Sequence, residues 1–203
     1  KIGSHVAKIA IAMGMEVIAF DPFVSADRAQ QMQVKITTIQ DLFERSDYVT
    51  LHLPRTPDTE NLVDSKLLES MKPTARIVNC ARGGIIDESA LAEAINTGVI
   101  AGAGLDVYAN EPLPKDSPLL SVDDRLILTP HLGASTAEAQ ENVAIDVAEQ
   151  IRDVLLGLPA RSAVNIPGLS AELMERLKPH LQLSETLGLL ASQLSGGQVN
   201  NLE

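Results

Sequence analysis

The chain has 203 residues, of which 45% are hydrophobic and 2% aromatic, and its formal net charge is −11. This length and apolar content suit one large domain or two small ones with a sizeable core, and they exclude a disordered chain. The acidic balance, without Lys/Arg-rich runs, argues against nucleic acid as a partner. No apolar run is long enough for a membrane helix, so a membrane is not expected as a partner either. A single cysteine, Cys80, excludes an internal disulfide and favours a cytoplasmic protein.

Strand and helix patterns alternate through the first two-thirds of the chain. Short β-branched runs predict strands, buried on both faces, at residues 17–20, 48–51, 76–79, 102–107 and 126–129. Helical patterns between them cover residues 4–13, 41–45, 65–71 and 88–96. Gly14 and Gly98 follow two of these helices as C-terminal caps, and Asp87 precedes the last of them as an N-cap. This rhythm predicts an α/β fold, a parallel sheet wrapped by helices.

The pattern changes after Pro130. Residues 135–156 form one long helical pattern whose apolar positions fall on a single stripe, namely Val143, Val147, Ile151, Val154 and Leu155. Residues 165–168 have the composition of a linker. A second helical pattern follows over 171–194, and Pro179 is expected to break it.

Gly3 and Asp21 are candidate residues of a dinucleotide site. A helix opening at Gly3 would present free N–H groups and a positive dipole end to a pyrophosphate. Gly3 can be only the third glycine of a G-x-G-x-x-G fingerprint, so the first strand and two glycines would lie before Lys1. Asp21 follows Gly3 by eighteen residues, where an acidic side chain binds the adenosine ribose and favours NAD over NADP. Alternatively, Gly3 simply starts a helix and Asp21 opens a turn.

Three polar residues follow three successive predicted strands, and they are Arg82, Glu111 and His131. The carboxyl ends of parallel strands are where such sheets place their active sites. Hydride transfer at a 2-hydroxy acid requires a histidine to move the hydroxyl proton, a carboxylate to stabilise the imidazolium, and a guanidinium to clamp the substrate carboxylate. The alternatives are a surface charge for Arg82, a loop start for Glu111 and a core histidine for His131.

Three motifs in this order resemble the signatures of the D-isomer-specific 2-hydroxyacid dehydrogenases. They span residues 79–84, 104–112 and 130–136, and residues 1–4 resemble the end of the same family's glycine loop. The resemblance implies a Rossmann-like doubly wound parallel sheet, here without its first strand. A long crossover helix would follow, and then the start of a further α+β domain.

The resemblance also implies roles for individual residues. Arg82, Glu111 and His131 would be catalytic, with Arg82 and His131 binding the substrate and Glu111 supporting His131. Asp21 would bind the adenosine ribose, and Asp106 the nicotinamide carboxamide. The implied cofactor is NAD, with contacts from Ile2, Gly3, Asp21, Leu53, Cys80, Ala81, Arg82, Asp106, His131, Gly133 and Ala134. No metal is expected, because the remaining histidines lack ligand spacing.

Within the family the chain is most similar to the long-type D-3-phosphoglycerate dehydrogenases, because residues 163–167 and the following helical pattern resemble the start of their intervening domain. The expected division is an NAD-binding domain over 1–134, a crossover helix and return to the substrate-binding domain over 135–165, and the start of the intervening domain over 166–203. The substrate-binding half is expected to precede Lys1, so this stretch alone is expected to be inactive.

The implied reaction is the oxidation of D-3-phosphoglycerate, a small phosphorylated 2-hydroxy acid, with NAD in serine biosynthesis. A homodimer or homotetramer is expected. Two alternatives remain open. One is another D-2-hydroxyacid dehydrogenase, of the glyoxylate/hydroxypyruvate reductase or D-lactate type. The other is an NAD-sensing binding protein like the corepressors related to this family.

Overall fold

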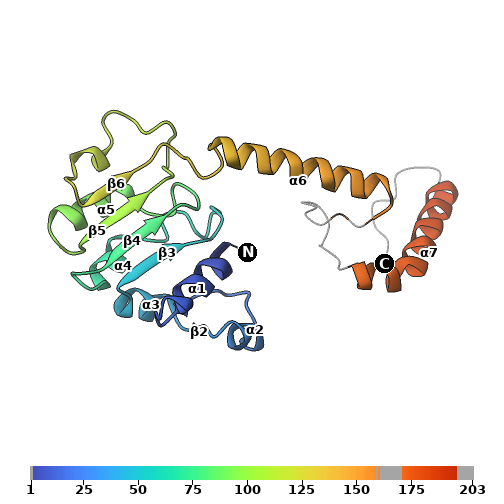
Figure 1. Cartoon of the computed structure of the whole chain (residues 1–203), viewed down its shortest axis with the longest axis horizontal. Helices are drawn as coiled ribbons and strands as arrows, with labels where there is room; N and C mark the ends of the chain where they lie inside the picture. Colours follow the sequence, from blue (N-terminus) through green and yellow to red (C-terminus); the bar gives the residue numbers. More distant parts are fainter. Residues whose placement is uncertain (1, 159, 161–170, 196–203) are drawn as a thin grey trace. The chain divides into compact units, whose positions relative to one another are not determined.

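A computed structural model describes residues 2–158, 160 and 171–195 of the chain. The chain divides into two compact units, 1–136 and 137–203, which are taken separately below (Figure 1). The predicted linker at 165–168 and the junction at 163–167 lie outside the described residues.

The first unit alternates helices and strands, as the sequence predicts. Its helices are α1 (Ile2–Ala12), α2 (Ala26–Gln31), α3 (Ile39–Arg45), α4 (Ser65–Ser70), α5 (Glu88–Asn96) and the 3₁₀ helix η1 (Pro118–Ser121). Its strands are β1 (Ile18–Ala19), β2 (Lys35–Ile36), β3 (Tyr48–Leu51), β4 (Arg76–Asn79), β5 (Gly102–Leu105) and β6 (Leu126–Leu128). Asp87 caps α5 as predicted, because its Oδ1 accepts hydrogen bonds from the N–H groups of Ser89 and Ala90.

All strand pairs are parallel. β3, β4, β5 and β6 form one sheet in that order, and β1 pairs with β2 in a separate two-stranded sheet. Tyr48 pairs with Arg76 at the start of β3 and β4, and Leu51 pairs with Asn79 at their ends. In-register parallel strands bring their carboxyl ends to one edge, and Figure 1 shows the arrowheads of β3, β4 and β5 pointing the same way. This edge is the place where the predicted site residues should meet.

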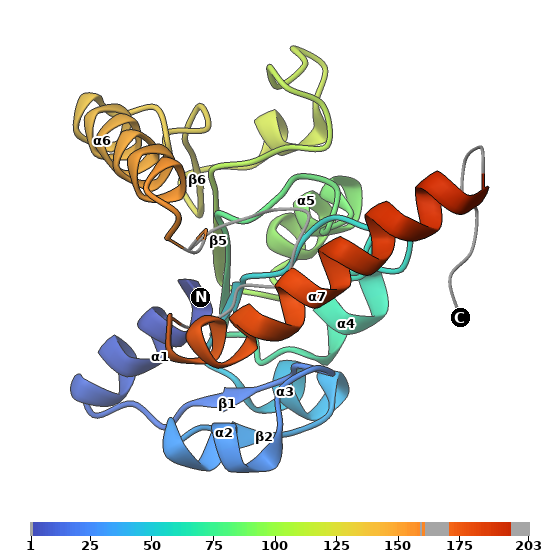
Figure 2. The same ribbon diagram turned by 90° about the vertical axis from the view of Figure 1, so that its right-hand side faces the viewer.

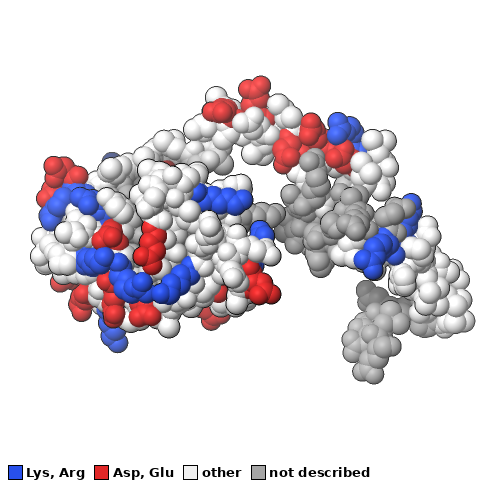
Figure 3. All heavy atoms as spheres, turned by 60° about the horizontal axis from the view of Figure 1, so that its bottom comes forward, with Lys and Arg blue, Asp and Glu red and all other residues white. Residues whose placement is uncertain are grey.

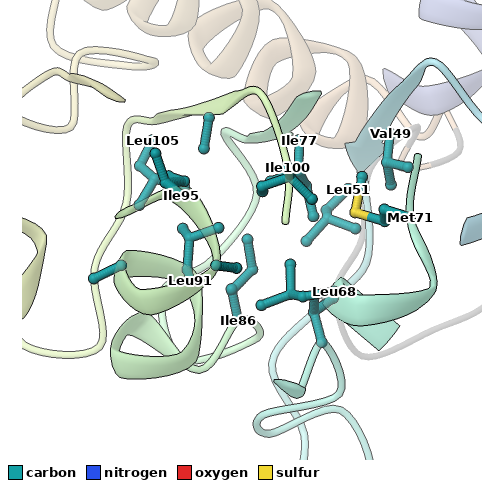
Figure 4. Packing of buried hydrophobic residues seen from close by; sticks show 14 of the residues in the cluster. Val49, Leu51, Leu68, Met71, Ile77, Ile86, Leu91, Ile95, Ile100 and Leu105 are labelled. Carbon is teal, nitrogen blue, oxygen red and sulfur yellow. The ribbon is translucent and has the colours of Figure 1, made fainter. Parts of the chain in front are cut away.

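The hydrophobic core lies on one face of the four-stranded sheet. α3, α4 and α5 pack side by side there, and Figure 2 shows α4 and α5 on the same side of the strands. Ile77 of β4 packs with Leu68 of α4 and Leu91 of α5, all with no exposed side-chain surface (Figure 4). These contacts fix the sheet and therefore the positions of the loops at its carboxyl edge.

The prediction of strands buried on both faces is wrong for β3, β4 and β6, whereas three of the four residues of β5 are buried. β3 and β4 alternate exposed and buried residues, and Tyr48 and Ile127 on the other face are 64% and 67% exposed. The reason is that the helices following β3 and β4 both return to the same face, so only every second side chain meets a helix.

Three short elements of the first unit were not expected from the sequence. α2 is polar, and both residues of β2 are exposed, so neither carries an apolar pattern. η1 lies in the acidic stretch near residue 120, yet its Leu119 is only 1% exposed and packs in the core. In each case a contact with the rest of the unit, and not local periodicity, determines the structure.

The described residues of the second unit form two helices, α6 (Ala137–Leu155) and α7 (Ala171–Ser195). The apolar stripe predicted on α6 exists, and its five residues are between 47% and 81% exposed. The expected break at Pro179 is wrong, because α7 continues through it; a proline removes one helical hydrogen bond without always ending a helix. Among the described residues, none of the helices combines the length and hydropathy that crossing a bilayer requires.

Candidate active site

His131 and Glu111 form the best-defined pair at the carboxyl edge of the sheet. The Nδ1 atom of His131 lies 2.7 Å from Oε2 of Glu111, although twenty residues separate them in the sequence. Glu111 belongs to the loop after β5, and His131 follows β6, so two neighbouring strands bring them together. The structure therefore joins two of the three residues that the sequence marked as a catalytic set.

The backbone around His131 is held in a tight turn. Its N–H donates to the Thr129 carbonyl at 3.0 Å, and its φ of 58° lies in the left-handed region. A non-glycine residue adopts this conformation only where its surroundings hold it. Asp106, at the end of β5, supplies part of that support from the neighbouring strand.

Asp106 is 7% exposed and accepts three hydrogen bonds from the His131 loop. The donors are the Thr129 hydroxyl at 2.5 Å, the Leu132 N–H at 2.8 Å and the Gly133 N–H at 3.0 Å. Burial alone would raise the pKa of Asp106, but these three donors together hold it below its usual range. Asp106 is therefore a carboxylate that organises the loop; its predicted contact with the nicotinamide stays a prediction.

Glu111 is anchored from two sides. Its Oε1 accepts a hydrogen bond from the Tyr108 N–H at 3.1 Å, while Oε2 faces His131. The hydrogen bond with His131, followed by that from the Tyr108 backbone, lowers the pKa of Glu111. The loop between β5 and Glu111 is also tied to α5, because the Ala109 N–H donates to Oε1 of Glu88 at 2.6 Å. Glu111 is thus an ionised, oriented partner for the imidazole.

Arg82 lies in the loop after β4, which Asn79 shapes. The buried Asn79 amide donates to the Arg82 carbonyl at 2.9 Å, and its oxygen accepts from the Ala81 N–H at 3.0 Å. The exposed Arg82 guanidinium donates to the Ala81 carbonyl at 2.6 Å. Among the described hydrogen bonds and ion pairs, Arg82 makes none with Glu111 or His131, so the structure places it at the same edge without joining it to the pair.

The start of α1 meets the loop after β3 at Gly3. A Cβ atom on Gly3 would lie 3.2 Å from the His52 side chain, so a glycine lets the helix approach this loop closely. His52 in turn contacts the Thr50 hydroxyl through Nε2 at 3.1 Å, and burial lowers the pKa of its imidazole. The neighbouring Leu53, a predicted cofactor contact, is partly buried, whereas Ile2 is 70% exposed.

The remaining predicted cofactor residues also follow strands. Asp21 comes just after β1, and its Oδ1 accepts a hydrogen bond from the Phe23 N–H at 2.9 Å. This contact is typical of a turn, which is the alternative role for Asp21. Cys80 follows β4 at the sheet edge. Burial, and then the charge of Asp106, raises the pKa of its thiol, which disfavours a nucleophilic thiolate. Gly133 and Ala134 are exposed in the loop after β6.

Sequence reasoning missed three residues that shape the site: Asn79, Tyr108 and Thr129. Asn79 and Tyr108 lie within the motifs that resemble the family's signatures, but the sequence assigned a role to neither. Thr129 carried no signal, because its partners are distant in the sequence. Within the part of the chain that the structure describes, no group of three or more His, Cys, Asp or Glu residues could hold a metal ion.

Charge is mixed over the surface of the first unit. Figure 3 shows basic and acidic side chains interspersed on the face turned to the viewer. With a net charge of −11, the chain has no global attraction for an anionic ligand. Local groups, such as the start of α1 and the Arg82 guanidinium, must therefore supply any affinity for one.

A parallel sheet with a glycine-opened helix and polar residues at its carboxyl edge defines the Rossmann class of nucleotide-binding domains. The chain belongs to the family described as D-isomer specific 2-hydroxyacid dehydrogenase, NAD binding domain, whose model matches residues 1–133. The predicted family, fold class and cofactor NAD are thereby confirmed.

Two similar curated proteins share one name. A D-3-phosphoglycerate dehydrogenase of Synechocystis is 60% identical over 202 residues, covering 100% of this chain and 36% of the relative. One from Archaeoglobus fulgidus is 45% identical over 203 residues, covering 100% of this chain and 38% of that protein. The chain thus spans little more than a third of the length of these relatives.

A solved structure of similar fold is the NAD-complexed D-isomer specific 2-hydroxyacid dehydrogenase from Lactobacillus delbrueckii ssp. bulgaricus. It is 36% identical, with a TM-score of 0.69, and the match covers 81% of this chain and 53% of that one. A D-lactate dehydrogenase with NAD⁺ from Lactobacillus jensenii is 28% identical with a TM-score of 0.70, over 81% of this chain and 53% of the other.

Proposed function

We propose that the complete gene product oxidises D-3-phosphoglycerate to 3-phosphohydroxypyruvate with NAD. The observation that carries the proposal is the 2.7 Å contact between His131 and Glu111. It occurs in a chain whose whole length matches about a third of a D-3-phosphoglycerate dehydrogenase at 60% identity. The proposed setting is serine biosynthesis in the cytoplasm, by a homodimer or homotetramer. Residues 1–134 would bind NAD, 135–165 would lead back to a substrate domain, and 166–203 would begin an intervening domain.

His131 is the proposed general base. Its Nδ1 faces Glu111, so Nε2 is the nitrogen that takes the proton from the substrate 2-hydroxyl as the C–H bond breaks and the carbonyl forms. The imidazolium that results is stabilised by the Glu111 carboxylate, which also holds the ring orientation. For each substrate molecule, the proton of the 2-hydroxyl oxygen passes to His131, and the hydride leaves carbon 2 for the hydride acceptor.

Arg82 is the proposed substrate clamp. The Asn79 amide fixes the loop that carries it, while its exposed guanidinium keeps several donors for a ligand. Two parallel N–H groups of a guanidinium match a carboxylate, and a positive charge beside the 2-oxygen polarises the forming carbonyl. This geometry suits a 2-hydroxy acid and leaves the choice among such acids to other contacts.

The residues at the sheet edge fit NAD. The close approach at Gly3, where a Cβ would press on His52, brings the start of α1 against the loop after β3, and the free N–H groups of a helix start suit a pyrophosphate. Asp21 would accept hydrogen bonds from the ribose, and the other proposed contacts are Ile2, Leu53, Cys80, Ala81, Arg82, Asp106, His131, Gly133 and Ala134. When bound, NAD supplies the hydride acceptor.

The decisive experiment measures NADH formation by the purified complete gene product with D-3-phosphoglycerate, D-lactate and D-glycerate in parallel. We expect the highest kcat/KM with D-3-phosphoglycerate. If only another of these acids is turned over, the assignment of D-3-phosphoglycerate as substrate is wrong, while the proposed dehydrogenase activity still holds. NAD binding without turnover of any acid would instead support the NAD-sensing alternative.

A further inference from the structure

Tyr108 follows β5 directly and is 7% exposed. Three parts of this residue, its N–H, its hydroxyl and its carbonyl, contact the loops that carry Glu111, His131 and Arg82. No other role in the chemistry falls to it, because its hydroxyl is engaged inside the fold.

The N–H of Tyr108 holds Glu111. It donates to Oε1 at 3.1 Å, which leaves Oε2 for the His131 imidazole. A carboxylate with one oxygen fixed has little freedom to rotate, so the direction of its second oxygen is determined. The position of Tyr108 is itself secured by the next residue, because the Ala109 N–H donates to Glu88 at the start of α5.

The hydroxyl of Tyr108 holds the turn before His131. It donates to the Thr129 carbonyl at 2.7 Å, and a second carbonyl, that of Leu105, lies 3.3 Å away. The Thr129 carbonyl is also the acceptor of the His131 N–H at 3.0 Å. The hydroxyl therefore fixes the oxygen to which the His131 backbone is bonded.

These contacts form a closed ring. His131 contacts Glu111 through its imidazole, and Glu111 contacts the Tyr108 backbone. The Tyr108 hydroxyl reaches the Thr129 carbonyl, and that carbonyl returns to the His131 N–H. Both ends of the His–Glu contact are thus tied to one buried aromatic residue, and the left-handed φ of His131 is held from two sides.

The carbonyl of Tyr108 faces the Arg82 loop. A Cβ on Gly83 would lie 1.7 Å from this oxygen, so the two loops touch through backbone atoms. Gly83 is the residue after Arg82, so Tyr108 also limits where that loop can lie.

We propose that Tyr108 is a positioning residue for the acid–base pair, whose hydroxyl sets the distance and orientation of His131 relative to Glu111. The proposal rests on the function proposed above. The titratable groups that act on the pair or on Tyr108 are Asp106 at the end of β5 and Glu88 of α5. The substitution Tyr108→Phe leaves each of these charged side chains in place, and Thr129 links the lost hydroxyl to Asp106.

The test compares Tyr108→Phe with Tyr48→Phe in the complete gene product. Each substitution removes one hydroxyl and keeps the ring; Tyr48 lies on β3, is 64% exposed and is the only other tyrosine of the chain. For Tyr108→Phe we expect kcat to fall about threefold to tenfold, the loss of one hydrogen bond, while the Kd for NAD stays within about twofold. Tyr48→Phe should leave both unchanged.

The pH dependence separates positioning from stability. With the hydroxyl gone, Glu111 supports the imidazolium less well, so the acidic limb of the kcat/KM profile should move to lower pH by about 0.3 units or more. The thermal midpoint, measured in parallel, reports any general loosening. A lower thermal midpoint with an unchanged pH profile would overturn the proposal.

A readout without turnover keeps this test apart from the proposed function. NMR titration of the imidazole nitrogens follows His131, with His131→Asn assigning its signal among the histidines. We expect its titration midpoint to fall in Tyr108→Phe and to stay constant in Tyr48→Phe. If no acid is turned over, the proposed function fails, yet this shift still supports the ring of contacts. Equal midpoints in wild type and Tyr108→Phe would contradict it.

Discussion

His131 and Glu111 meet at 2.7 Å through Nδ1 and Oε2, with 46% and 36% of their side chains exposed. A pair so accessible to water contributes little to the free energy of unfolding. Its orientation nevertheless decides which imidazole nitrogen faces a ligand. The pair is therefore expected to matter for turnover far more than for folding.

Replacing Glu111 by Gln keeps its shape and removes its charge. The imidazolium formed during oxidation then lacks its counter-charge, and we expect kcat to fall by about 10²-fold, within the range of general acid–base effects. Steady-state kinetics with NAD and the preferred 2-hydroxy acid measure this. The matched control is Glu69→Gln on the exposed side of α4, which should leave kcat unchanged. Full activity in Glu111→Gln would remove the carboxylate from the mechanism.

His131→Asn and Arg82→Ala test the two other roles. Asparagine tolerates the left-handed backbone of His131, so the first change removes the base without straining the turn. We expect turnover to fall by about 10³-fold or more in each variant, with NAD still bound. Isothermal titration with NAD checks binding. Each residue is one of several proposed cofactor contacts, so a complete loss of NAD binding in both variants would show that they act mainly by holding the cofactor.

Asp21→Ala should relax the preference for NAD over NADP. The carboxylate would repel a 2′-phosphate, so its removal should raise the relative kcat/KM for NADP about tenfold or more. Asp27→Ala in α2 is the control, because it removes a nearby charge of the same sign. If the ratio of kcat/KM values for the two cofactors does not change, Asp21 does not contact the ribose. Its only role would then be the turn in which it accepts the Phe23 N–H.

Much of this site could be predicted from the sequence, because its residues follow apolar runs that form strands β3 to β6. Residues after parallel strands meet at one edge, and this rule brought Glu111 to His131 without knowledge of any contact. The hydroxyl of Tyr108 on the Thr129 carbonyl could not be predicted, because it spans 21 residues and depends on side-chain packing. β2 escaped prediction for a different reason: two exposed residues carry no apolar pattern.

Gly83→Ala should destabilise the first unit. The added Cβ would meet the Tyr108 carbonyl oxygen at 1.7 Å, and both loops would have to move. We expect a loss of about 3 kcal/mol or more in the free energy of unfolding. Urea titration followed by circular dichroism measures it. Gly104→Ala in β5 is the control, since the nearest atom to its Cβ would be 4.0 Å away, and it should cost less than about 1 kcal/mol. Equal stability of the two variants would contradict the close contact.

The hydrogen bonds to Asp106 make stability depend on acid pH. The folded chain holds the pKa of Asp106 below its usual value, so the unfolded chain binds a proton more readily. This contribution is fully present above the ordinary Asp pKa of about 3.9 and is lost as the pH falls through the lower, folded pKa. Asp106→Asn removes an acceptor from the buried donors and should cost about 2 kcal/mol or more near neutrality.

The test therefore measures, as a function of pH, the difference in the free energy of unfolding between wild type and Asp106→Asn, called the gap. It should stay constant from about pH 7 to pH 5 and narrow below about pH 4, where wild-type Asp106 becomes protonated. Urea titrations at each pH measure it, with Asp124→Asn as an exposed control whose gap stays near zero. A gap that stays constant down to the lowest pH at which the protein folds would mean that the three donors do not depend on the charge of Asp106.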